Sequence, residues 1–371
     1  MKNVSCFSIL LSLSLPGLFS PEARAEIRGE RPFRTGVLKL NEGVDETKPV
    51  AAMDLSGWVV KDDLLVGPFD KNWLIGYSLK TRKPVWWLNL EAAAVTPFLA
   101  YENYIYAGLQ NGAVVKISAQ DGKAVWQTKL DAYVGQKFLV AGDVLYAFTV
   151  TQQLFAIDST TGKTKWIYDA GEPESLLIGN ASGPVLAGGT VLVGTSSGEI
   201  HQVDSASGKL NWSVKPDFNE GRFHDIVGNI VVNEQRIVFT RYDGFVGSFL
   251  TSDPEHQMIW EQKLPTITTN TEKNGALYIG HLNGDVTAYD AGNGNKSWTV
   301  STGQAVLSIV AHENKLFVIG TNGRVTKVDA EKGVIGWNDD LEATVNKPPL
   351  LHDGRLYVST GQKVFYGYKA R

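Results

Sequence analysis

The sequence predicts an all-β protein, an eight-bladed β-propeller of four-stranded antiparallel blades. Three observations support this fold: a tryptophan that returns about every forty residues, turn signals at fixed offsets from it, and apolar alternation with period two between them. The clearest copy is residues 314–337, where strand, Asn-Gly turn, strand, Asp-to-Gly turn and tryptophan strand follow one another. A unit this short cannot bury both faces alone, so each must pack on its neighbours.

The tryptophans set the period of the repeat. Each removes ~150–250 Å² from water when buried, so we expect these side chains to lie between blades and not to stack on a ligand. The steps between them are 40, 40, 46, 48, 38 and 39 residues. The seven positions are Trp86, Trp126, Trp166, Trp212, Trp260, Trp298 and Trp337.

Two recurrent turns exclude helical repeats of the same length. At the first, Asn322-Gly323 is expected to supply both positive-φ positions of a two-residue hairpin. The second runs from Asp to Gly over five residues, as in Asp158 to Gly162, where Asp bonds the backbone and Gly takes the left-handed position. The first turn recurs as Asn111-Gly112, Ser197-Gly198, Asp243-Gly244 and Asn283-Gly284.

Four strands per unit follow from these turns. In the second unit we expect strands at 96–100, 104–109, 113–118 and 123–130, the first innermost and the tryptophan strand outermost. The last unit, 355–369, lacks a tryptophan strand, while 33–40 is a strand without a unit. Segment 33–40 is therefore expected to complete the eighth blade and close the ring. The alternative is a seven-bladed ring with a divergent end.

The N-terminus reads as a signal peptide, residues 1–25. Lys2 precedes an apolar run at 7–19, and Ala23 to Ala25 matches an A-x-A cleavage site. A stop-transfer anchor is the competing interpretation, which the shortness of the run disfavours. Cys6 precedes the apolar run, so no lipid-anchoring cysteine is seen at the cleavage point. We expect an exported periplasmic protein whose residues 26–371 form a single propeller domain.

Composition and motifs give little support to enzymatic chemistry. A net charge of −4 and a pI near 5.9 predict no nucleic-acid partner. The six histidines lack metal-ligand spacing, and we predict no metal and no cofactor. Residues 194–198 match G-x-S-x-G, but a nucleophile elbow needs a strand before and a helix after it. Here the pattern falls on the hairpin position, so we predict that the protein is not an enzyme.

Two stretches break the period, before and after the fourth tryptophan unit. Residues 168–183 contain the apolar run Leu176-Leu177-Ile178, and residues 215–225 contain Pro, Gly and two aromatic residues. Insertions in repeat proteins map to loops that often form the binding face, and exposed apolar patches tend to mark partners. Both stretches are candidate partner-binding loops. The alternative is that they are simply tolerated insertions.

The repeat itself resembles a known one. The segments from Asp158 to Trp166 and from Asp204 to Trp212, each with Gly-Lys in the middle, are similar to the quinoprotein-type propeller repeat over essentially the whole mature chain. Quinone-dependent dehydrogenases of that class carry a vicinal disulfide and a calcium site, which a mature chain without cysteine cannot supply in full. The chain more closely resembles the BamB family of outer-membrane assembly factors. That resemblance implies an eight-bladed exported scaffold that binds the periplasmic domains of BamA.

The resemblance also implies where the partner binds. An apolar loop entering blade four and an acidic segment entering blade five make the contact in that family. Here the family's Arg and final Asp are replaced by Gly179 and Val227. The implied partner-binding residues are Leu176, Leu177, Ile178, Arg222, Phe223 and Asp225.

Three functions stay open at this point. The first is a monomeric, non-enzymatic scaffold that helps outer-membrane β-barrel proteins assemble by binding a BamA-like component. The second is a small-ligand or quinone-binding redox propeller that uses its central channel. The third is an exported interaction module with another partner.

Overall fold

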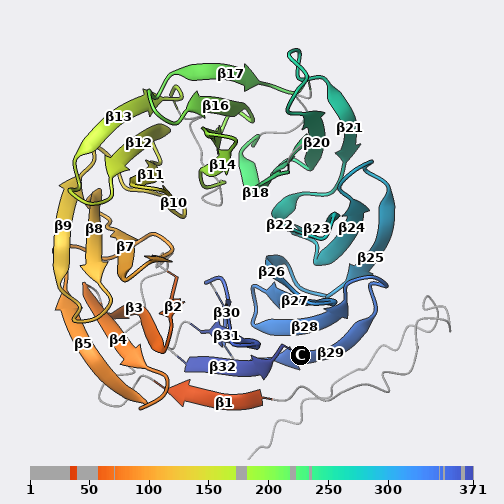
Figure 1. The fold of residues 1–371 in the computed structure, drawn as a ribbon. Coiled ribbons are helices and arrows are strands. Elements are labelled where there is room, and N and C mark those ends of the chain that lie inside the picture. Colours follow the sequence, from red (N-terminus) through yellow and green to blue (C-terminus); the bar gives the residue numbers. More distant parts are fainter. Residues whose placement is uncertain are drawn as a thin grey trace, which may run out of the picture.

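The computed structural model describes residues 34–39, 57–70, 72–172, 182–217, 223–233, 236–341, 343–345, 347–360 and 364–370. In these residues all regular structure is β-strand, arranged as eight four-stranded antiparallel sheets around a central axis (Figure 1). The predicted eight-bladed β-propeller is confirmed, and the seven-bladed alternative is wrong. Residues 1–25, assigned to a signal peptide, lie outside the described residues.

The strands are as follows. Blade 1 comprises β2 (Val59–Lys61), β3 (Leu64–Asp70), β4 (Trp73–Ser78) and β5 (Lys83–Asn89); blade 2 comprises β6 (Leu99–Tyr101), β7 (Tyr104–Gly108), β8 (Ala113–Ser118) and β9 (Ala124–Lys129). Blade 3 comprises β10 (Leu139–Ala141), β11 (Val144–Phe148), β12 (Gln153–Asp158) and β13 (Thr164–Asp169); blade 4 comprises β14 (Val185–Ala187), β15 (Thr190–Gly194), β16 (Ile200–Asp204) and β17 (Leu210–Val214). Blade 5 comprises β18 (Ile226–Val232), β19 (Arg236–Arg241), β20 (Phe245–Leu250) and β21 (Met258–Lys263); blade 6 comprises β22 (Ile267–Lys273), β23 (Ala276–His281), β24 (Asp285–Asp290) and β25 (Lys296–Ser301). Blade 7 comprises β26 (Val306–His312), β27 (Lys315–Gly320), β28 (Arg324–Asp329) and β29 (Ile335–Asp340); blade 8 comprises β30 (Leu350–His352), β31 (Arg355–Ser359), β32 (Val364–Lys369) and β1 (Arg34–Lys39).

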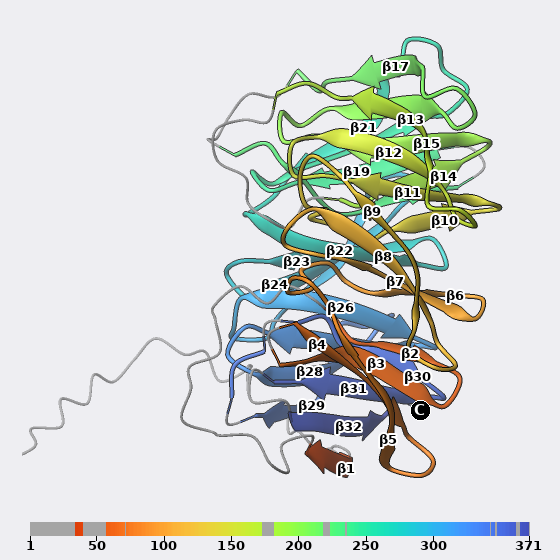
Figure 2. The ribbon, with the colours of Figure 1, turned by 90° about the vertical axis from the view of Figure 1, so that its left-hand side faces the viewer.

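Each of blades 1 to 7 runs outward in chain order, with its tryptophan on the outermost strand (Figure 1). From the side, the blades are twisted layers that follow one another around the ring, with β5, β9 and β13 on its outer wall (Figure 2). The four strands expected in the second unit are all present as β6 to β9, although all but the third are shorter than predicted.

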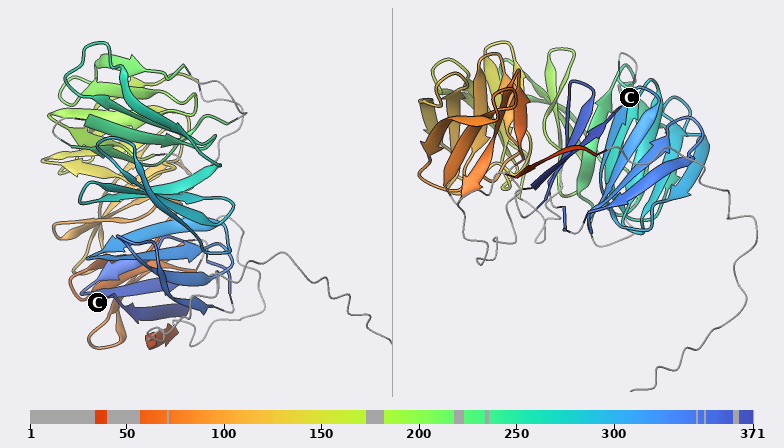
Figure 3. Two further views of the ribbon diagram at one scale, coloured as in Figure 1. Left: turned by 90° about the vertical axis from the view of Figure 1, so that its right-hand side faces the viewer. Right: turned by 90° about the horizontal axis from the view of Figure 1, so that it is seen from below.

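The chain ends close the ring, as predicted from 33–40. Strand β1 pairs antiparallel with β32, with Val37 opposite Tyr366, and so supplies the outermost strand of blade 8. Figure 3 shows β1 crossing from blade 1 to the last blade. Inside this seam the rings of Trp58 and Phe365 pack edge to face, with centroids 4.8 Å apart.

The first recurrent turn differs from the prediction. Gly323 has φ +90°, but Asn322 does not have positive φ, so the hairpin is not the two-residue type. Three residues separate β27 from β28, and Gly323 N–H donates to Gly320 O at 3.1 Å. This is the three-residue connection in which only the last position is left-handed. The Asn preference has another cause: in the equivalent turn, Asn111 Oδ1 accepts the Ala113 N–H at 3.0 Å.

The second recurrent turn and the tryptophan meet between successive blades. Gly333 of blade 7 has φ +67°, and a Cβ placed on it would lie 2.5 Å from Cδ2 of Trp298 in blade 6. The same indole donates its Nε1–H to Ala330 O at 3.1 Å. Glycine is thus required both by the backbone and by the ring lying on it. The contact recurs as Trp86 on Gly122, Trp126 on Gly162, Trp166 on Gly208 and Trp260 on Gly294.

The hydrophobic core also lies between successive blades. The buried apolar residues form eight clusters, one at each junction between neighbouring blades. The predicted role of the tryptophans as packing residues between blades is confirmed. Blade 5 departs from the pattern: His256, with φ 52°, takes the glycine position, and its ring lies 4.3 Å from that of Trp212.

Candidate functional site

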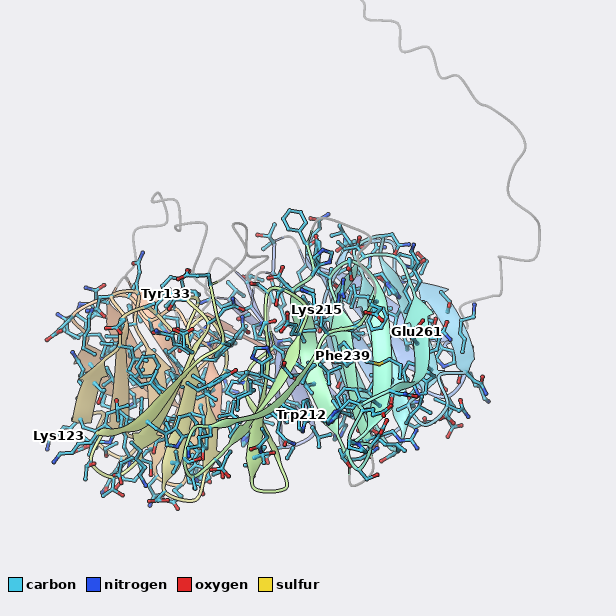
Figure 4. The ribbon with its side chains drawn as sticks, turned by 90° about the horizontal axis from the view of Figure 1, so that it is seen from above. Lys123, Tyr133, Trp212, Lys215, Phe239 and Glu261 are labelled. Atoms are coloured by element: carbon cyan, nitrogen blue, oxygen red, sulfur yellow. The ribbon has the colours of Figure 1, made fainter. Side chains whose placement is uncertain are left out.

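The two irregular stretches connect the outermost strand of one blade to the innermost strand of the next. We call residues 170–184, between β13 and β14, the first connection, and residues 215–225, between β17 and β18, the second connection. Figure 4 shows Tyr133 and Lys215, both in such connections, toward one face of the ring, and Lys123, between β8 and β9, toward the other. The predicted residues Leu176, Leu177, Ile178 and Arg222, and also Gly179, lie outside the described residues.

The described ends of the two connections touch. Ser182 N–H, at the end of the first connection, donates to Ile226 O at 2.8 Å. Ile226 directly follows the second connection, and its N–H donates to Thr195 O of blade 4 at 3.2 Å. Segments more than forty residues apart in the chain therefore meet at one place, which the sequence alone did not show.

The end of the second connection rests on a buried ion pair. Arg241 is 0% exposed and donates from Nε to Asp243 Oδ1 at 3.2 Å and from Nη2 to the other carboxylate oxygen. Nδ1 of His224 lies 2.7 Å from Arg241 Nη2 and 2.9 Å from Asp243 Oδ2. Both members of the buried pair therefore contact His224 and hold its ring in place.

Phe223 and Asp225 flank His224 in the sequence. Phe223 is half-buried, with its ring edge to face against Tyr242 at 6.2 Å between centroids. Asp225 is 1% exposed, and its carbonyl accepts the Tyr242 N–H at 3.0 Å. A carboxylate this deep does not face a partner from the surface, which differs from the charged contact expected for it. The partner-binding role of both residues stays a prediction.

The buried ion pair of Arg241 and Asp243 was not predicted from the sequence. Arg241 occupies the hairpin position filled by Leu109, Thr149, Thr195 and His281 in other blades. The signal in the sequence that could have revealed the pair was the basic residue Arg241, two positions before Asp243 of the Asp243-Gly244 turn.

Polar groups on two innermost strands, and in a connection that leads to a third, pair with one another. Lys137, in the connection before β10, donates from Nζ to Asn229 Oδ1 of β18 at 2.7 Å. Asn229 N–H in turn donates to Asn270 Oδ1 of β22 at 2.9 Å. Lys137 is accessible to solvent, but the surrounding protein lowers its pKa by desolvation. The arrangement links the connection that leads into blade 3 with blades 5 and 6.

The motif at 194–198 is not a nucleophile elbow. It joins β15 to β16, so the strand before it is followed by another strand and not by a helix. Ser196 is 4% exposed. Across the described ranges, no group of three or more His, Cys, Asp or Glu side chains could hold a metal ion. Nor does that part of the chain contain a helix that is long and apolar enough to cross a bilayer.

Fold and site together define a repeat β-propeller in which the described ends of two irregular connections meet. The sequence profile of the family described as outer membrane protein assembly factor BamB matches residues 70–300 and 282–371. The chain therefore belongs to this family.

Individual relatives are more distant. BamB of Yersinia pestis is 24% identical over 204 residues, which are 51% of this chain and 51% of that protein. BamB of Escherichia coli K12 is 28% identical over 120 residues, 29% of this chain and 30% of that protein. The chain thus matches about half, or less, of the length of these curated relatives.

Solved structures resemble the fold. The crystal structure of BamB from Moraxella catarrhalis superposes with a TM-score of 0.78 at 18% identity, covering 91% of this chain and all (100%) of that chain. Quinohemoprotein alcohol dehydrogenase from Comamonas testosteroni reaches 0.66 at 13% identity, covering 85% of this chain and 74% of that chain. At these identities the likeness concerns the architecture alone.

Proposed function

We propose that this protein is a non-enzymatic periplasmic scaffold that assists the assembly of outer-membrane β-barrel proteins. It acts as a monomer, exported by residues 1–25, and binds a BamA-like component of the barrel-assembly machinery. The family match over residues 70–371 carries the proposal. It is supported by the meeting of the two connections at Ser182 and Ile226.

The contact is divided between the connections. Leu176, Leu177 and Ile178 supply apolar anchors from the first connection, and Phe223 adds a half-buried ring from the second. Asp225 acts from inside, where its carbonyl bonds Tyr242 and fixes the end of the second connection. Arg222 directly precedes Phe223 in the sequence. Such a surface suits a protein partner, because a few apolar anchors carry most of the affinity at interfaces.

The test is co-purification with the cognate BamA-like protein from envelopes. Leu176→Asp with Phe223→Ala is expected to lower capture at least tenfold, since truncating an anchor costs ~1–3 kcal/mol. Asp225→Lys is not used because it would replace a buried carboxyl group by a longer, basic side chain and so disturb the fold. The matched control is Val334→Asp, a 59% exposed apolar side chain in blade 7. Equal capture by the double variant and the control would refute the proposal.

A further inference from the structure

Blade 1 exposes two tryptophans that are not the packing tryptophan of the repeat. Trp87, on β5, is 45% exposed, and Trp73, on β4, is 42% exposed. Trp73 lies opposite Asn89, two residues along β5 from Trp87, so the two indoles are diagonal neighbours on one face of the sheet. The ring of Phe69, on β3, packs edge to face on Trp87 with centroids 4.6 Å apart. Three aromatic rings therefore lie together on the outer part of this blade.

The packing of the ring does not require an aromatic residue at position 87. In blade 1 the contact between blades is made by Trp86, whose ring lies on Gly122. The residue that follows the repeat tryptophan is exposed in every blade from 1 to 7. In the other six blades this residue is Gln127, Ile167, Ser213, Glu261, Thr299 or Asn338, so it is polar in all but blade 3. A group of exposed aromatic rings that folding does not explain tends to mark a contact surface.

The turn that leads into β5 is basic, unlike the equivalent turn of the other blades. From Ser78 to Lys83 it contains no acidic residue, and the basic side chains of Lys80, Arg82 and Lys83 are exposed. Ser78 takes the place of the usual Asp, and its hydroxyl oxygen accepts the Thr81 N–H at 2.9 Å. Arg82, with φ +56°, takes the place of the usual glycine. None of the six equivalent turns, in blades 2 to 7, has a net positive charge.

We infer that the outer wall of blade 1 docks on an anionic phospholipid surface. The basic turn supplies the opposite charge, in a chain whose net charge is −4. Asp63, whose Oδ2 accepts the Ser78 hydroxyl at 2.6 Å, offsets only one of the three cations. Lys83 and Trp87 are four residues apart, which is about 13 Å along a strand, so charges and rings belong to one patch. Indole rings, which are apolar but carry one N–H donor, suit the head-group level of a bilayer.

The place of the patch on the ring suits a membrane. Strand β5 is the outermost strand of its blade and lies on the outer wall, where a broad surface can reach the patch (Figure 2). Blades 1 and 5 stand on opposite sides of the ring (Figure 1). A membrane contact through blade 1 therefore leaves the connections at blades 4 and 5 on the far side. The inference is thus independent of the proposed function.

Vesicle binding of the chain purified from the cell envelope tests the contact. The vesicles contain phosphatidylcholine, with or without phosphatidylglycerol. The native chain should bind the anionic vesicles and dissociate as salt is raised. Trp73→Ser with Trp87→Ser should weaken binding roughly fivefold or more, and Lys80→Glu with Lys83→Glu should weaken binding to anionic vesicles roughly tenfold or more. The matched control is Ile167→Ser, which removes a 51% exposed apolar side chain from the equivalent position of blade 3 and should leave binding unchanged.

Brominated phospholipids locate the contact, because they quench indoles that reach the acyl chains. Trp73→Phe with Trp87→Phe should keep the binding, since the rings stay apolar, but lose most of the quenching. Native-like binding by the folded serine or glutamate double variant, or no binding of the native chain to anionic vesicles, would overturn the inference. The glutamate variant changes only an exposed turn, so it decides the question even if the serine variant unfolds. A native chain that does not bind vesicles but forms a dimer that Trp87→Ser dissociates would assign the patch to a second copy and overturn the membrane contact.

Discussion

Replacing Gly333 by Ala should destabilise the protein more than an ordinary glycine substitution. Two costs add at this position. A left-handed φ of +67° costs an alanine ~1–2 kcal/mol. The new Cβ would also lie 2.5 Å from the Trp298 ring, which its Nε1 bond to Ala330 O holds in place. Overpacking of this kind costs ~1–3 kcal/mol, so we expect a total of about 2–5 kcal/mol.

Gly275 provides the matched control. It has φ +82°, and no atom lies within 4 Å of a Cβ placed there. Gly275→Ala should therefore cost only the backbone term, about 1–2 kcal/mol. Urea unfolding followed by tryptophan fluorescence gives both free energies from the midpoint and slope. If the two variants lose equal stability, the packing of each tryptophan on the next blade's glycine is not what requires glycine there.

Three further predictions concern closure of the ring by β1, stability at acid pH, and the buried ion pair of Arg241 and Asp243. Deleting 34–39 leaves β32 with an open edge and should lower the melting temperature and speed proteolysis; an unchanged melting temperature would show that β1 is dispensable. The pKa of Asp158 is lowered first by the Thr161 N–H, so its stabilisation is complete above the unfolded-state value of about 4 and is lost as pH falls through the lower folded value. The free energy of unfolding, measured with urea, should therefore fall less between pH 5 and pH 3 for Asp158→Asn than for the native chain. An equal fall in the two proteins would contradict the stabilising role of the Asp158 carboxylate. Arg241→Met leaves the Asp243 carboxylate buried and should cost ~3–5 kcal/mol, with partial recovery on adding Asp243→Asn. A cost below about 1 kcal/mol for Arg241→Met would mean that the pair does not anchor His224.

The ring could be predicted because its determinants are local and repeated. Five of the seven tryptophans lie on the turn glycine of the next blade, so several copies of the pattern reinforce one inference. The unpaired segment 33–40 predicted the closure because the last unit lacks its outer strand. The hairpin type was predicted wrongly from Asn322-Gly323, since this pair also suits a three-residue connection in which only the glycine is left-handed.

The site could be predicted only in outline. Period breaks located the two connections, because an insertion disturbs the spacing of tryptophans. Their contact through Ser182 and Ile226 depends on the curvature of the ring, which no local pattern records. The burial of Asp225 likewise follows from Arg241 and Tyr242, which belong to a hairpin that follows it in the chain and packs on it in space.

Site-specific photocrosslinking in intact envelopes tests most directly whether the connections at blades 4 and 5 are the working surface. A photoreactive residue would replace Leu177, Phe223 or, as the control, Val334 in the full chain. We expect the first two positions to crosslink to the same BamA-like protein and the control position to give no such product. Crosslinking of that protein from Val334 alone, or from none of the three, would contradict the assignment.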